Sequence, residues 1–179
     1  VDKMNMRNVN IVARYESKLL RRDIVFLGFV VIALVGISLW QMIKQGRVNV
    51  FWYKVALPSS FPFFSMYYYN LVQVLIALFV CMEVVYRERK DAMEVFLCRP
   101  FRNSEYCIGR FLGIFRMFLF VNICVLLVCM YINLWVVGAP FNVWIYVFYL
   151  FTLSIPTLIF VLGCALSISA MVKNRPLSV

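Results

Sequence analysis

Long runs without a charged residue constrain the fold of this chain more than any other feature. The hydrocarbon core of a bilayer is about 30 Å thick and requires about 20 apolar residues in a helix. Four runs meet this length, at residues 24–43, 65–85, 111–137 and 143–172. Only Glu83 and Arg116 place a charge inside them. The sequence therefore predicts an all-α, polytopic membrane protein with one transmembrane domain over residues 1–179.

The composition supports this interpretation and excludes many enzyme classes. Hydrophobic residues make up 64% of the chain and the mean hydropathy is +0.88, both high for a soluble domain of this size. Histidine is absent, which excludes Ser-His and Cys-His catalytic pairs and the usual histidine ligands of zinc and haem. We therefore expect no catalytic, cofactor-binding or metal-binding residues in this chain.

The fourth run is 30 residues long and carries no charge. At 1.5 Å per residue it would measure about 45 Å as a helix, more than the bilayer core, so it must tilt or bend. Pro156 is the expected place, because proline removes a backbone donor and clashes with the preceding turn.

The distribution of positive charge predicts the orientation in the membrane. The chain has a net charge of +10, and the segments outside the four runs carry 14 and 3 Lys or Arg residues on alternate sides. The side richer in Lys and Arg is expected to be cytoplasmic, so we expect the chain in a cell (cytoplasmic) membrane with both termini in the cytoplasm. The excess positive charge then indicates topology rather than nucleic-acid binding. All four tryptophans fall near the predicted outer ends, as in an aromatic belt (Trp40, Trp52, Trp135 and Trp144).

Residues 1–23 precede the first run, and 4–22 within them have the pattern of a helix lying on the inner membrane surface. At about 100° per residue, one arc of this helix is apolar (Ile11, Val12, Tyr15 and Leu19). The neighbouring arc is cationic (Arg7, Arg14, Lys18 and Arg21). The pattern favours an interfacial helix. The alternative is an ordinary cationic flank of the first span, which requires no periodicity.

Residues 87–110, between the second and third runs, form a predicted cytoplasmic segment. Met93, Phe96 and Leu97 have the spacing of an apolar helical stripe, and charged residues cluster at 87–91. Pro100 disfavours the helical region for the residue before it, so this helix should end there. A second helix can begin at Asn103 or Ser104, with Glu105 in its first turn, where the helix dipole favours an anion.

These residues resemble the type-2 ATP-binding-cassette (ABC) exporter permeases. The matching positions are Glu88 and Arg89, then Glu94, the apolar pair Phe96 and Leu97, Pro100, and Gly109 with Arg110. The N-terminal stretch with Arg14, Glu16, Lys18 and Arg21 is similar to the elbow helix of that family. Two positions depart from the family pattern: Ala92-Met93 replaces the usual Gly-Thr, and Arg110 replaces a Lys.

The resemblance implies a permease subunit with six spans, of which this chain would contain the first four. It also implies a dimer with a second permease copy or half, and a separate ABC-type ATPase docked beneath the cytoplasmic segment. ATP and magnesium would be bound by that ATPase, because this chain lacks a phosphate-binding loop. The expected partner-coupling residues are Glu88, Arg89, Asp91, Glu94, Phe96, Leu97, Arg99 and Pro100. The alternative is a solvated inner loop whose charges only fix the topology.

Polar residues within the runs suggest two further features. Glu83 and Arg116 are each near the inner end of a span and could form an ion pair, or each could extend separately to the interface. Asn122 and Asn133 could line a pathway, although polar residues in spans more often join helices.

We therefore expect a transmembrane permease subunit of an ATP-driven ABC-type exporter, without enzyme activity of its own. The alternative is a non-transporting membrane scaffold or assembly subunit, which would not require a cargo. An intramembrane enzyme is disfavoured because Glu83 and Arg116 do not supply an acid, a base and a nucleophile. A channel is disfavoured because no run contains a filter-like glycine segment.

Overall fold

The computed structural model describes residues 6–47, 60–91, 103–137 and 141–171, and these form helices without any β-strand. The α-helices are α1 (Met6–Arg21), α2 (Ile24–Arg47), α3 (Ser60–Asp91), α5 (Asn103–Ile132), α6 (Val143–Tyr149) and α7 (Ile155–Met171). Two five-residue π-helical segments are also present, η1 (Asn133–Val137) after α5 and η2 (Leu150–Ser154) between α6 and α7. The predicted all-α class is confirmed for the described residues.

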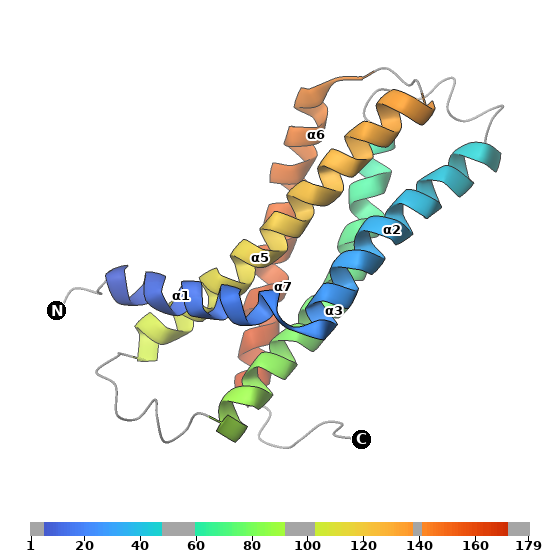
Figure 1. Cartoon of the computed structure of the whole chain (residues 1–179). Coiled ribbons are helices and arrows are strands. Elements are labelled where there is room, and N and C mark those ends of the chain that lie inside the picture. Colours follow the sequence, from blue (N-terminus) through green and yellow to red (C-terminus); the bar gives the residue numbers. More distant parts are fainter. Residues whose placement is uncertain (1–5, 48–59, 92–102, 138–140, 172–179) are drawn as a thin grey trace.

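The long helices alternate in direction, and α1 crosses one end of the bundle (Figure 1). This is the end at which α3 and α7 finish and α5 begins (Figure 1). The charged residues at 87–91 belong to the last turns of α3 at the same end. The fold therefore brings together the segments in which the sequence concentrates its cations.

Three helical segments are long and apolar enough to cross a membrane, and a fourth is added if α1 and α2 count as one bent span. The three are Phe61–Val84, Ser104–Trp135 and Val143–Ile168. The bent pair consists of Met6–Arg21 and Ile24–Trp40, whose axes differ by 71°. Lengths and composition thus agree with a multi-pass membrane protein of three to four spans.

Asp23 lies at the bend between α1 and α2. Its backbone carbonyl accepts a hydrogen bond from the Leu27 amide at 2.9 Å, and its side chain accepts one from the Val25 amide at 2.9 Å. Acidic side chains at this position satisfy the amides that a helix start leaves without intrahelical partners. Asp23 therefore begins α2 in a new direction while remaining buried.

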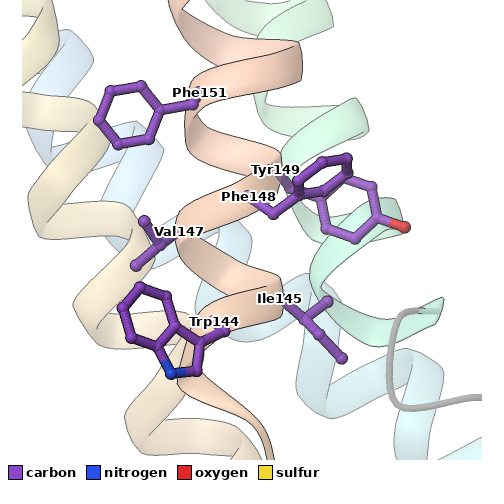
Figure 2. Close-up of a pocket in the computed structure, with 6 residues that line it drawn as sticks. All are labelled: Trp144, Ile145, Val147, Phe148, Tyr149 and Phe151. Carbon is purple, nitrogen blue, oxygen red and sulfur yellow. The ribbon is translucent and has the colours of Figure 1, made fainter.

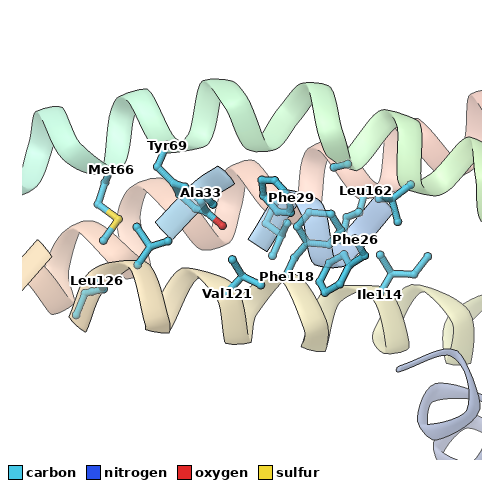
Figure 3. Packing of buried hydrophobic residues seen from close by; sticks show 14 of the residues in the cluster. Phe26, Phe29, Ala33, Met66, Tyr69, Ile114, Phe118, Val121, Leu126 and Leu162 are labelled. Atoms are coloured by element: carbon cyan, nitrogen blue, oxygen red, sulfur yellow. The ribbon is translucent and has the colours of Figure 1, made fainter. Parts of the chain in front are cut away.

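The core lies between α2, α3, α5 and α7, where aromatic side chains interlock (Figure 3). The ring of Phe118 on α5 lies 5.5 Å from that of Phe26 and 5.7 Å from that of Phe29, both on α2. Phe29 in turn stacks on Tyr69 of α3 at 6.5 Å between ring centroids. Edge-to-face and offset contacts at these separations are favourable. They fix the relative positions of three of the four long helices.

Helix boundaries near the cytoplasmic segment agree only in part with the pattern of the sequence. α5 begins at Asn103 with Glu105 in its first turn, as predicted. α3, however, continues through Asp91, so residues 87–91 extend this helix beyond its membrane-length part instead of opening a separate helix. The reason is local, because residues 85–91 contain neither Gly nor Pro and are mostly good helix formers.

The fourth predicted span contains a π-helical turn immediately before Pro156. Proline cannot donate the backbone hydrogen bond that a regular α-helix needs at its position, and a π-turn is one way to accommodate the mismatch. Its last residue, Ser154, is turned into the core and is 1% exposed. The predicted bend at Pro156 stays a prediction, and the structure shows a change of helix type that ends two residues before this proline.

Candidate functional site

α1 packs closely against α5 at two glycines of α5. A Cβ atom added at Gly109 would lie 2.7 Å from Val12 Cβ and 2.9 Å from the Val9 carbonyl oxygen. One added at Gly113 would lie 2.7 Å from Glu16 Cβ and 2.8 Å from the Ala13 carbonyl oxygen. Because these distances are too short for real Cβ atoms, only glycine permits this packing. Small residues four positions apart commonly bring two helices this close.

A buried ion pair lies beside the glycines. The Nε atom of Arg110 is 3.8 Å from Oε1 of Glu16, and the exposed fractions of the two side chains are 8% and 6%. The Arg110 guanidinium also lies 5.9 Å from the centre of the Tyr106 ring. Removing two charges from solvent is costly, and the attraction between them compensates only when both are well placed. The pair therefore adds an electrostatic contact between α1 and α5 to the apolar ones.

Hydrogen bonds connect the same two helices along their length. Asn8 Nδ2 donates to Glu105 Oε2 at 3.0 Å near the start of α5. The Ser17 hydroxyl lies 3.1 Å from the Gly113 carbonyl oxygen, and it also lies 2.7 Å from the carbonyl oxygen of Ala13 in its own helix. Contacts of α1 thus span at least two turns of α5. The two helices form one packed unit, which we call the α1–α5 clamp and define by Asn8, Glu16, Glu105, Gly109, Arg110 and Gly113.

The clamp changes the interpretation of the amphipathic pattern in α1. The side facing α5 contains Val9, Val12, Ala13 and Leu20 together with Glu16. Ile11 and Tyr15, predicted on the same apolar arc as Val12, are instead 49% and 59% exposed. The predicted apolar face is therefore divided between a contact with α5 and a surface directed away from it.

Sequence reasoning missed most of the clamp. It used Gly109, Arg110 and Glu16 only as positions of family resemblance. The available signal was the Gly109–Gly113 spacing, which is the G-x-x-x-G pattern of close helix packing. No local signal would have identified Asn8 as a partner of Glu105, because 97 positions separate them.

The expected partner-coupling residues are placed only in part. Glu88, Arg89 and Asp91 belong to the last turns of α3, and their side chains fall outside the described structure. The others, Glu94, Phe96, Leu97, Arg99 and Pro100, lie outside the described residues. Their coupling role stays a prediction. The structure does show that both helices flanking them, α3 and α5, reach the end of the bundle where α1 packs (Figure 1).

Glu83 and Arg116 lie on α3 and α5 respectively. The exposed Arg116 donates from Nη1 to Oδ1 of Asn10 on α1 at 3.2 Å. Glu83 is half-buried. The predicted ion pair between Glu83 and Arg116 stays a prediction. The hydrogen bond from Arg116 to Asn10 is a further contact between α5 and α1.

Asn122 and Asn133 are both buried and join helices. Asn122 Nδ2 lies 3.2 Å from Gln73 Oε1 on α3 and 2.8 Å from the Phe118 carbonyl oxygen of its own helix. Asn133 Nδ2 donates to the Tyr146 hydroxyl on α6 at 2.7 Å. A similar hydrogen bond joins α3 and η2, from Asn70 Nδ2 to the Ser154 hydroxyl at 3.2 Å. In this conformation these polar groups connect helices inside the core, and a pathway role for the two asparagines stays a prediction.

A shallow groove of about 610 Å³ runs around α6 and the start of η2. Its lining is aromatic and aliphatic (Trp144, Ile145, Val147, Phe148, Tyr149 and Phe151). Figure 2 shows Trp144, Val147 and Phe151 on one side of the helix and Ile145 and Tyr149 on the other. Trp144 is 79% exposed. A surface of this composition suits contact with lipid chains near a membrane interface.

Within the described ranges, no three His, Cys, Asp or Glu side chains are grouped closely enough to hold a metal ion. The comparisons with protein-family models, curated proteins and solved structures found no match to this chain. A function can therefore be inferred only from the structure itself. Three features bear on it: the clamp, the buried interhelical hydrogen bonds, and the gathering of charged segments at one end of the bundle.

Proposed function

We propose that this chain is the transmembrane permease subunit of an ATP-driven ABC-type exporter in a cell (cytoplasmic) membrane. A separate ATPase subunit would bind ATP and magnesium and hydrolyse the nucleotide, while this chain would move the substrate. The observation that carries the proposal is the α1–α5 clamp, because it ties α1 to the first turns of a 30-residue helix that passes through the core.

α5 begins within the predicted coupling segment, at Asn103, three residues after Pro100. Because α-helices are stiff over this length, a displacement at Asn103 would reach the core residues Phe118 and Asn122 on the same helix. The clamp would make α1 move with it. An ATPase docked at residues 87–99 would thereby act on α5 and α1 at once.

The proposal includes a topology in which α1 is interfacial and four spans follow it. Both termini and the coupling segment would be cytoplasmic, in agreement with the bias of positive charge toward one side. α2 would be the first span, entered through the 71° bend at Asp23. A second permease copy or half would complete the transporter.

Purification of the tagged, full-length chain from its native membranes tests this proposal. We expect an ATPase with a phosphate-binding loop to co-purify and to hydrolyse ATP in the presence of magnesium. Alanine at Glu94 or Phe96 should release most of that ATPase. Phe120→Ala is the matched control, because Phe120 lies on α5 and is 62% exposed. Absence of an ATPase, or equal retention by all three variants, would contradict the proposal.

A membrane scaffold or assembly subunit is the second candidate. It is favoured by the way Asn122 and Asn133 are engaged between helices at 0% and 1% exposure. A scaffold would hold its partners without dependence on Glu94, Phe96 or ATP. Retention of the ATPase by the wild-type chain, and its loss from the Glu94 and Phe96 variants, therefore distinguishes a permease from a scaffold.

A further inference from the structure

The exposed surface of α1 is cationic to an unusual degree, because the acidic residues around it are turned inward. Glu16, Asp23 and Glu105 are 4%, 7% and 4% exposed. Arg7, Arg14, Lys18, Arg21 and Arg22 are all exposed. The burial of the carboxylates therefore separates the charges of this region and leaves its outer surface positive.

The exposed cations are also aligned. At about 100° per residue, Arg7, Arg14, Lys18 and Arg21 fall within an arc of about 60° on α1. This arc, which we call the cationic stripe, lies nearly opposite the buried side chains of α1, which include Val12 and Glu16. The side chains of Arg14, Lys18 and Arg21 are exposed in this arc.

A second exposed surface of α1 adjoins the stripe. Ile11 and Tyr15 are centred about 70° from the stripe around the helix axis and are 49% and 59% exposed. Two residues separate the end of α1 from the start of α2, so α1 lies next to the point where the chain enters its long apolar helices. An apolar surface next to a row of cations is the pattern of a helix in the headgroup region, where cations contact lipid phosphates.

We propose that the cationic stripe of α1 is a binding surface for anionic phospholipid headgroups. The apolar residues Ile11 and Tyr15 would enter the boundary of the acyl chains, and the stripe would contact the phosphates beside them. The clamp would hold α1 in this orientation through Gly109, Gly113 and the ion pair of Glu16 with Arg110. This inference does not depend on the chain being a transporter, since it concerns the membrane surface alone.

The test is made on the full-length chain reconstituted in phosphatidylcholine vesicles that contain either spin-labelled phosphatidylglycerol or spin-labelled phosphatidylcholine. Electron spin resonance measures the fraction of each label that the protein immobilises. We expect the anionic lipid to be preferred by about threefold or more, given that each cation near an anionic surface contributes favourably. The preference should largely disappear in about 1 M NaCl, where the screening length is about 3 Å.

Charge variants show which residues cause the preference for the anionic lipid. The triple change Arg14→Gln, Lys18→Gln and Arg21→Gln should lower it to near unity, and the helix content should stay unchanged because all three side chains are exposed. The matched control removes three cations from the predicted outer loop, by Lys44→Gln, Arg47→Gln and Lys54→Gln, and should retain the preference.

Three outcomes would overturn the inference. The first is an equal affinity of the wild-type chain for the two lipids. The second is loss of the preference in the outer-loop control but not in the stripe variant. The third is displacement of the anionic lipid by inorganic phosphate at constant ionic strength, which would assign the stripe to a soluble anion.

Discussion

Glu16 of α1 and Arg110 of α5 form a buried ion pair, with Oε1 and Nε 3.8 Å apart. They are 94 positions apart in the sequence and lie where the first helix meets the helix that runs into the core. Both side chains are largely buried, so the pair couples the position of α1 to that of α5.

Removal of one partner should therefore cost more stability than removal of both. We expect Glu16→Leu or Arg110→Leu to reduce the free energy of unfolding by about 3 kcal/mol, because each leaves a buried charge without its counterion. The double variant should lose less than the sum of the two. Unfolding of all four proteins in mixed micelles gives the coupling energy. Strictly additive losses would mean that the two side chains do not interact.

The two glycines of the clamp should not tolerate a methyl group. Gly109→Ala and Gly113→Ala place a Cβ atom 2.7 Å from Val12 Cβ and Glu16 Cβ respectively, and should destabilise the chain by about 1–3 kcal/mol. Gly28→Ala and Gly36→Ala on α2 are matched controls, because no atom lies within 4 Å of the added carbon. These should be neutral or more stable by up to about 1 kcal/mol.

Trypsin sensitivity reports the same contact independently, because Arg14 and Lys18 of α1 are exposed cleavage sites. Detachment of α1 should accelerate cleavage there in the Gly109 and Gly113 variants but not in the α2 controls. Uniform cleavage rates across the four variants would show that the glycines do not hold α1 in place.

Asn122 should matter less for stability than its complete burial suggests. Interhelical hydrogen bonds in membranes contribute about 0.6 kcal/mol on average, and Oδ1 of Asn122 has no hydrogen-bond partner among the described residues. We expect Asn122→Leu to change the free energy of unfolding by less than about 1 kcal/mol. Ser167→Ala, which removes only a bond to the helix's own Gly163 carbonyl, is the control. A loss above about 3 kcal/mol would identify a cooperative polar network instead.

The sequence predicted what depends on local patterns. Apolar runs located three membrane-length segments, and Asn103 and Glu105 marked the start of α5. In each case the cause lies within a few residues of the feature, such as a capping side chain.

The clamp could not be predicted in the same way. An amphipathic pattern assigns charged residues to the solvent side, whereas Glu16 faces α5 and forms an ion pair with Arg110 there. The division of Ile11 and Val12 between two surfaces likewise depends on where α5 passes. Such features are determined by tertiary contacts between distant segments, and periodicity within α1 contains no information about them.

The most direct test of the proposed coupling is the accessibility of Cys98, a native cysteine within the predicted coupling segment that is not one of the coupling residues. A variant that keeps Cys98 as its only cysteine is treated with a membrane-impermeant maleimide. We expect no labelling in intact cells, labelling after permeabilisation, and protection when the ATPase is bound. Labelling in intact cells, or equal labelling with and without the ATPase, would contradict it.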